Sequence, residues 1–446
     1  MKECLPGTLG LHCVRAKRPI DGPSIAIHPS IMTGAPPDPT GLASATDGES
    51  LDPGIRTGGS LAAIWARYRR PLAIAIGCTA VLRIMVGLVA LLAKYASDFP
   101  HVIAHNPGVL DSVFFQWDVG QYAAIAVRGY PAGPIAHGAQ NSIAFAPMFP
   151  FLERLTHVVT GLGAANSGML VSLVALVAAL TGLHRLIALD HPAAVADTTV
   201  VLLLAWPLAF FFLVGYPESL ALALVVWAFL AARSRQWLAV GLLVAGACLT
   251  KYYLLLVLVP LVYELWVAHR SKPTPLKTWV VRGALLVGPA VVAIGGWMMF
   301  CAIRFDDPLA FVHAQAGWNR SLAWPWDMVT RTGGDLWHLR FLDTSVASTD
   351  ELVSTVTVVL MIVATVSAFS NLRRSYALFL AVATALFVCN TILESTGREV
   401  LVLFPLFLVF ATWCERHPWL ERLLFALFLP TAYYLIERFV TLRFAG

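Results

Sequence analysis

The stretch of sequence with the most residues able to do chemistry is polar and aromatic, and it centres on Trp117 and Asp118. It reads Phe115-Gln116-Trp117-Asp118-Val119-Gly120-Gln121-Tyr122 and continues to Val127-Arg128-Gly129-Tyr130. On a helix, Trp117, Gln121 and Arg128 would share one face, and Asp118 and Tyr122 would be neighbours on the adjacent face. A carboxylate beside aromatic rings can have a shifted pKa and accept a proton from a hydroxyl group. Asp118 could therefore act as a base, or it could simply cap a loop helix.

Three other places combine charged and polar residues with the ends of apolar runs. They are Gly215-Tyr216-Pro217-Glu218-Ser219, Thr250-Lys251-Tyr252-Tyr253 and Glu394-Ser395-Thr396-Gly397-Arg398. Lys251 and Arg398 could stabilise the negative charge of a phosphate, or could instead reach toward the membrane interface. Arg128 and Arg320 are reserves for the same role. Glu218 could bind a sugar hydroxyl, orient a basic residue, or only occupy a helix N-terminus.

The sequence contains no strong metal-binding pattern. His137, His313 and His338 lack the tight His/Asp spacing of a metal site. The adjacent Asp306 and Asp307 are typical of a loop turn. We predict no metal site, and a loose requirement for a divalent cation, Mg²⁺ or Mn²⁺, stays open.

The composition sets the class of protein that must position these residues. The chain has 446 residues, of which 58% are hydrophobic and 13% charged; its mean hydropathy is +0.73. Soluble chains are near 25% charged, so a soluble enzyme is excluded. The net charge of +5 comes from short basic clusters between apolar runs, as in the cytoplasmic loops of membrane proteins, and gives no reason to expect a nucleic-acid partner.

The chain divides into a polar tail and one membrane domain. Residues 1–65 are rich in Pro, Gly, Ser, Thr and Asp without an apolar period, which predicts a disordered cytoplasmic tail. Residues 66–446 form a single polytopic all-α domain of about ten or eleven membrane-spanning helices. Spans are expected near 71–96, 167–188, 198–216, 219–232, on both sides of 250–253, and near 279–303, 352–370, 376–393, 399–414 and 420–440.

The basic residues predict the orientation of the domain in a cell membrane. Arg67, Arg69 and Arg70 precede the first span, and the positive-inside rule then places the N-terminus in the cytoplasm. Two large loops, 97–165 and 304–350, consequently lie on the non-cytoplasmic side. The polar clusters around Asp118, Glu218, Lys251 and Arg398 also fall on that side, which predicts one shared polar cavity. Arg83, inside the first span, should face the bundle and find a partner such as Glu218 or Asp118.

The motif residues resemble those of the PIG-V family of mannosyltransferases, membrane enzymes of the GT-C superfamily. The matching residues are Trp117-Asp118, Tyr122, Ile125-Ala126, Gly129-Tyr130, Ala144 to Pro150, Tyr216 to Ser219, Asp307 to Val312, Gln315, Trp324-Pro325-Trp326 and Arg398 to Phe407. The resemblance covers about residues 65–440. Gln116, Ala146 and Lys251 depart from the family pattern, in which Arg, Phe and Arg are usual, and they leave the acceptor open.

This resemblance implies a GT-C-like bundle and a specific reaction. The donor would be a polyprenyl-phosphate sugar, with mannose as the expected sugar, and the acceptor a hydroxyl on a lipid-linked or cell-surface glycan. Asp118 would be the catalytic base in a single inverting displacement. Lys251 and Arg398 would bind the donor phosphate. The substrate-binding residues would be Trp117, Tyr122, Arg128, Tyr216, Glu218, Gln315 and Arg320.

The alternative from another class is a polytopic transporter or lipid flippase that binds a headgroup in the same outward cavity. Transporters usually contain paired repeats with broken spans in matching halves, and the sequence shows no convincing internal repeat. The large aromatic loops also favour an enzyme over a transporter.

Overall fold

The computed structural model describes residues 61–96, 114–133, 140–318, 320–327, 330, 346–390, 393 and 395–441. Within these residues the regular elements are helices. In addition, Leu322 and Asn390 form an isolated antiparallel β-bridge. The predicted all-α, polytopic membrane class is confirmed. Most of the predicted tail lies outside the described residues, but residues 61–65 already belong to the first helix.

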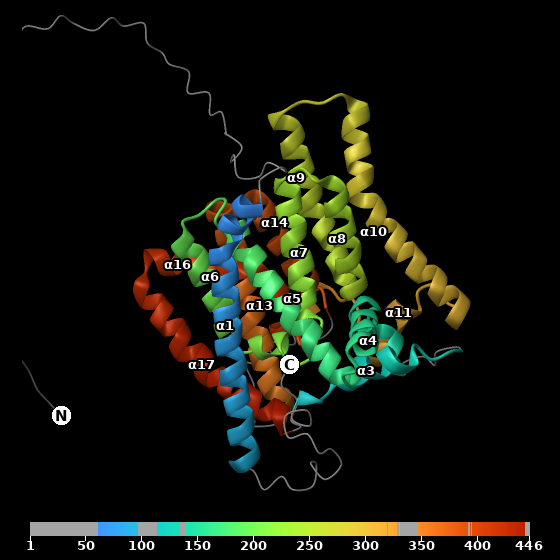
Figure 1. Ribbon diagram of the computed structural model, residues 1–446, viewed down its shortest axis with the longest axis vertical. Coiled ribbons are helices and arrows are strands. Elements are labelled where there is room, and N and C mark those ends of the chain that lie inside the picture. The colour runs from blue at the N-terminus through green and yellow to red at the C-terminus, as the bar shows by residue number, and fades with distance from the viewer. Residues whose placement is uncertain are drawn as a thin grey trace, which may run out of the picture. The chain divides into compact units, whose positions relative to one another are not determined.

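The helices fall into three groups by length (Figure 1). The long ones are α1 (Leu61–Ala96), α5 (Ala164–Ile187), α10 (Leu276–Phe305), α13 (Val346–Asn371) and α17 (Pro418–Val440). Those of intermediate length are α3 (Asp118–Arg128), α4 (Met148–Thr160), α6 (Ala193–Ala205), α7 (Glu218–Arg233), α8 (Trp237–Thr250), α9 (Leu258–Ser271), α14 (Arg374–Val388) and α16 (Phe404–Arg416). Short turns include α11 (Ala310–His313), α15 (Thr396–Glu399), η3 (Ser142–Ala144), η4 (Ala209–Phe212), η5 (Tyr252–Val257), η6 (Ala314–Trp318) and η8 (Val400–Val402).

Among the described residues, six helical segments are long and apolar enough to cross a membrane. They are Ala62–Ala93, Ala164–Ile187, Tyr252–Ser271, Leu276–Phe305, Asp350–Asn371 and Pro418–Val440. The pair Thr396–Val402 and Phe404–Arg416, bent by 83°, adds a seventh if it is one broken span. Three shorter apolar helices, α6, α8 and α14, follow the same pattern. The count of ten or eleven spans stays a prediction, because it requires shorter helices to cross as well.

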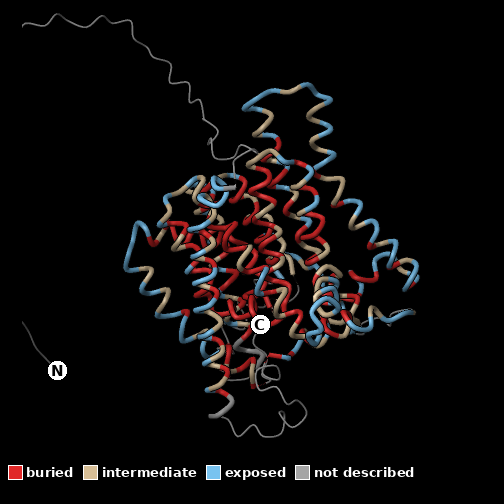
Figure 2. The backbone as a smooth tube through the Cα atoms, in the orientation of Figure 1, coloured by how far each residue is buried: buried red, intermediate tan, exposed pale blue. Residues whose placement is uncertain are grey.

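The core of the bundle is apolar and closely packed, and its outer helices present apolar faces. Figure 2 shows the buried residues gathered along the middle of the bundle, with exposed residues on α1, α10 and α17. Val291, Val292 and Ile303 of α10 are among these exposed apolar residues. In a membrane protein such faces meet lipid chains rather than water, so their exposure carries no penalty.

The end of the bundle opposite α3 is held by buried and half-buried ion pairs. Arg233, the last residue of α7, donates both of its terminal nitrogens to Asp190, at 2.5 and 2.9 Å. Arg373 binds the buried Glu264 through two nitrogens, at 2.6 and 2.9 Å. Because α7 has 16 residues, its two charged ends lie about 24 Å apart. That separation is close to the ~30 Å thickness of a hydrocarbon layer.

Two of the expected spans differ from the structure. The span predicted at 198–216 is wrong, because α6 ends at Ala205 and is followed by the turn η4. Pro207 explains the break, since proline disfavours helical backbone at the residue before it and lacks the N–H group that a helix needs. The span predicted at 399–414 is not straight, because the chain bends by 83° between Thr396–Val402 and Phe404–Arg416.

Candidate active site

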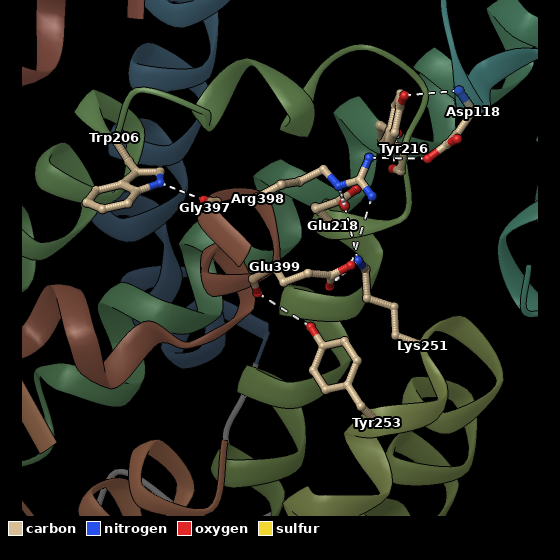
Figure 3. Close-up of polar contacts among 10 residues, drawn as sticks. Asp118, Trp206, Tyr216, Glu218, Lys251, Tyr253, Gly397, Arg398 and Glu399 are labelled. Atoms are coloured by element: carbon tan, nitrogen blue, oxygen red, sulfur yellow. Dashed lines mark hydrogen bonds and ion pairs between the residues drawn. The ribbon is translucent and has the colours of Figure 1, made fainter. Parts of the chain in front are cut away.

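The four polar clusters meet, and each contributes from the end of a helix. Asp118 is the first residue of α3, Glu218 the first of α7, and Lys251 follows the last residue of α8. Arg398 lies on α15, the short first part of the bent pair. Figure 3 shows their side chains pointing toward one another. The predicted convergence of these residues is confirmed, and Glu399 joins them. We call these five residues the ion network.

Asp118 lies at the edge of the ion network. Its Oδ2 accepts a hydrogen bond from Nη1 of Arg398 at 3.2 Å, and its backbone N–H donates to the hydroxyl of Tyr216 at 3.1 Å (Figure 3). The residue in the N-cap position of α3 is Trp117, which makes no capping hydrogen bond through its side chain. The alternative that Asp118 acts only as a cap is therefore disfavoured. With 23% of its side chain exposed, Asp118 is the most accessible member of the ion network.

Lys251 bridges two buried carboxylates. Its Nζ donates to Oε1 of Glu218 at 3.1 Å and to Oε2 of Glu399 at 2.6 Å. The backbone at Lys251 is extended, so the chain turns there between α8 and η5 and directs the ammonium group inward. The hydroxyl of Tyr253 donates to the backbone oxygen of Glu399 at 3.4 Å, which ties the same turn to α15.

Arg398 lies at the centre of the ion network. Besides Asp118, its guanidinium is 3.3 Å from Glu218, between Nε and Oε1, and 4.0 Å from Glu399, between Nη2 and Oε1. Its Cζ lies 5.2 Å from the ring centroid of Phe211 and 5.1 Å from that of Tyr216. Stacking on aromatic faces favours a cation, and the planar guanidinium fits between rings better than an ammonium group would.

The charges of the ion network do not balance. Asp118, Glu218 and Glu399 supply three negative charges against the two positive charges of Lys251 and Arg398, which leaves a net charge of −1 when all are ionised. Arg320 adds positive charge close enough to act on Glu399. Both predicted phosphate-binding cations therefore already have carboxylate partners. A phosphate would have to displace a carboxylate from one of them.

Tyr216 accepts a hydrogen bond from the backbone of Asp118, and Tyr122 packs against Tyr216. Burial raises the pKa of both hydroxyl groups well above the ordinary tyrosine value, and the nearby charge of Asp118 raises each pKa further. Both tyrosines therefore remain protonated. Their rings meet edge to face at 6.2 Å, and Tyr122 also packs against Phe149 at 5.2 Å.

Local sequence explains how α15 presents Arg398. Gly397 lies so close to Leu208 that an added Cβ would be 2.6 Å from Cδ1 of that residue, so a larger residue would require the leucine side chain to move. The indole N–H of Trp206 donates to the backbone oxygen of Gly397 at 2.8 Å (Figure 3). Ser395 has a φ of 65°, which turns the chain into α15. In membrane proteins, broken helices of this kind often lie beside a binding site.

The remaining predicted site residues lie around or away from the ion network. Trp117 is exposed beside Asp118, but its φ of 55° places it before the helix, so the predicted shared face with Gln121 does not form. Arg128 is exposed at the far end of α3, ten residues from Asp118 or about 15 Å along the axis. The side-chain amide of Gln315 donates to the backbone oxygen of Ala144 at 3.1 Å.

Sequence reasoning missed Glu399 and misplaced the partner of Glu218. A carboxylate next to Arg398 in an otherwise apolar run was the available signal, because such a group needs a buried cation. Glu218 pairs with Lys251 and Arg398 rather than with Arg83. The guanidinium of Arg83 instead lies 5.0 Å from the ring centroid of Phe114.

His313 does not form part of a metal-ligand set in the structure. Its Nδ1 is 2.7 Å from Oδ2 of Asp307, while Oδ1 of Asp307 accepts the N–H of Leu309, which confirms the predicted loop turn. Among the described residues no group of three or more His, Cys, Asp or Glu side chains is placed to hold a metal ion. His137 and His338 lie outside the described residues.

Comparison with known proteins gives no family assignment. No family model matches the chain, and no curated protein or solved structure matches it.

Proposed function

We propose that this chain is a membrane glycosyltransferase that moves a mannosyl residue from a polyprenyl-phosphate donor to a hydroxyl group of a lipid-linked or cell-surface glycan. The reaction would take place on the non-cytoplasmic side of the cell membrane and would invert the configuration of the anomeric carbon. The observation that carries the proposal is the position of Asp118, an accessible carboxylate bonded to a buried arginine at one end of a membrane bundle.

The proposed step uses the residues of the ion network as follows. Asp118 accepts the proton of the acceptor hydroxyl while the acceptor oxygen bonds to the anomeric carbon and the bond from that carbon to the phosphate oxygen breaks. The electron pair leaves with the polyprenyl phosphate. Arg398 is placed to stabilise the charge that develops on the phosphate, since it lies next to Asp118. Lys251 and Arg320 add further positive potential near Arg398.

The apolar outer faces of the helices fit a lipid-linked donor. A polyprenyl chain can remain in the hydrocarbon layer while its phosphate and sugar reach the polar end of the bundle. The position of the ion network at the ends of α7 and α8 supports this arrangement.

Transfer by purified protein in nanodiscs tests the proposal. Radiolabelled polyprenyl-phosphate mannose and a lipid extract of the host should give a labelled product, and Asp118→Asn should lower the rate by about 10²- to 10⁴-fold, because loss of a general base costs that much. The matched control is Asp197→Asn, which also breaks a bond to an arginine, the 2.8 Å contact with Arg70 at the other end of the bundle. It should transfer normally.

Two results would count against the proposal. If the wild-type protein transfers no sugar to any acceptor, the proposed activity is refuted. If Asp118→Asn and wild type transfer at equal rates, the assignment of Asp118 as the base is refuted. Movement of a lipid headgroup across liposomes without sugar transfer would favour the transporter or flippase instead.

A further inference from the structure

A second group of residues beside the ion network has the chemistry of a ligand site. We define the aromatic cluster as Tyr130, Phe145, Tyr252, Trp297, Phe311 and Trp318. Its members come from the chain after α3, from the residue that follows η3, and from η5, α10, α11 and η6. Figure 1 shows α11 and the end of α10 near α3 and α4.

The rings of the aromatic cluster lie in contact with one another. Tyr130 meets Trp297 edge to face at 5.2 Å, Tyr252 lies 4.6 Å from Phe311, and Phe145 meets Trp318 at 5.6 Å. One hydroxyl group of the cluster, in contrast to those described next, has a hydrogen-bond partner. The hydroxyl of Tyr130 donates to the backbone oxygen of Phe145 at 2.8 Å.

Three hydrogen-bonding groups of the aromatic cluster are buried without a partner among the described residues. They are the hydroxyl of Tyr252 and the indole nitrogens of Trp297 and Trp318. Trp297 is 8% exposed, and its indole N–H lies near enough to the hydroxyl of Tyr252 to interact with it, although the geometry falls short of a full hydrogen bond. A buried donor with a poor acceptor or none is unfavourable, so these groups are able to bind acceptor oxygens from outside the protein.

The cluster is joined to the ion network on two sides. Tyr252 lies between Lys251 and Tyr253, both of which contact Glu399, while Tyr252 itself contacts Phe311 in the aromatic cluster. Phe145 meets Tyr122 edge to face at 5.1 Å, and Tyr122 is one turn along α3 from Asp118. A ligand at the aromatic cluster would therefore lie beside the candidate base.

We propose that the aromatic cluster binds a pyranose ring. Aromatic faces pack against the apolar C–H faces of a sugar, and its hydroxyl oxygens can accept the bonds that Tyr252, Trp297 and Trp318 leave unmade. The sugar can belong to the donor or to the acceptor. The assignment rests on the proposed function, since it names where that reaction holds a sugar.

Binding by full-length protein in nanodiscs separates the two sources. The donor probes are citronellyl phosphate and its mannosyl and glucosyl forms, and the acceptor probe is methyl mannoside. Wild type should prefer a glycosylated lipid over citronellyl phosphate. Tyr252→Phe and Trp297→Phe should each weaken that binding roughly three- to tenfold, the effect of one hydrogen bond, without changing affinity for citronellyl phosphate. A loss confined to methyl mannoside would assign the cluster to the acceptor.

Trp279→Phe is the matched control. Its indole nitrogen is likewise buried without a partner among the described residues, and it lies 18 residues before Trp297 on α10, about 27 Å away. It should bind every probe as wild type does.

Three outcomes would overturn the assignment. They are unchanged sugar binding in both cluster variants, an equal loss in Trp279→Phe, and wild-type protein that shows no preference for a sugar and binds no mannoside. Sugar binding that is sensitive to Tyr252→Phe in a protein that transfers nothing would refute the proposed function and leave the sugar site standing.

Discussion

Replacing Arg398 by Gln should lower both the free energy of unfolding and the rate of sugar transfer, because both depend on the positive charge of the guanidinium. Arg398 is 8% exposed and lies 3.2, 3.3 and 4.0 Å from the carboxylates of Asp118, Glu218 and Glu399. Its removal changes the net charge of the ion network from −1 to −2. Breaking a buried ion pair by deleting one partner costs about 3–5 kcal/mol. Loss of one preorganised donor to a developing anion lowers a rate by about 10²- to 10³-fold.

A second substitution separates the two effects. Glu218→Gln combined with Arg398→Gln returns the net charge to −1, so the free energy of unfolding should recover most of what Arg398→Gln lost. Transfer should stay low, because no cation replaces the guanidinium. Arg398→Lys keeps the charge but loses the planar contacts with the rings of Phe211 and Tyr216, and it should fall between wild type and Arg398→Gln.

The assay is unfolding by denaturant in bicelles, read beside mannose transfer. The control is Arg416→Gln, which loses an exposed hydrogen bond of 2.7 Å to Asn371 and should change the free energy of unfolding by about 1 kcal/mol or less. The reasoning fails if Arg398→Gln unfolds and transfers like wild type. It also fails if the double variant is no more stable than the single one.

The packing between helices and the burial of one acid give two further predictions. Burial raises the pKa of Glu153 to about 8, against 4.5 unfolded, so the folded state loses about 1.4 kcal/mol per pH unit between those values. Glu153→Gln should therefore match wild type below pH 4.5 and melt progressively higher than wild type toward pH 8; a constant difference across that range would contradict this. An added Cβ at Gly241 would lie 2.2 Å from the backbone oxygen of Leu285, so Gly241→Ala should force α8 and α10 apart and lower the melting temperature. Gly288→Ala, with open space around the new methyl, should leave it unchanged, and equal melting of the two variants would show the contact to be unimportant.

The sequence was sufficient to predict the helical membrane class and the meeting of four distant clusters. Apolar runs locate helices, and charged residues at their ends tend to lie at the same depth. For Asp118, Glu218, Lys251 and Arg398 this was enough to predict one shared site.

Which charges would pair was not predictable in the same way. Lys251 and Arg398 were both expected to face a phosphate, but the position of a partner depends on how α15 bends back into the bundle. That bend depends on Gly397 packing against Leu208 and on the bond from Trp206, residues almost two hundred positions earlier. No local pattern contains such information. The break at Pro207, in contrast, was predictable locally from the proline itself. The apolar residues on both sides of it led instead to the prediction of one continuous span.

The pairing of Arg398 with Asp118 connects phosphate binding to release of the base. A donor phosphate that takes the guanidinium must displace Oδ2 of Asp118, which then faces the acceptor without its partner. The two anions compete for one cation, so Asp118→Asn should bind citronellyl phosphate more tightly than wild type even though it transfers sugar much more slowly. Asp197→Asn, whose arginine lies at the other end of the bundle, should bind it as wild type does. Weaker binding by Asp118→Asn would show that Asp118 orders Arg398 for the phosphate rather than competing with it.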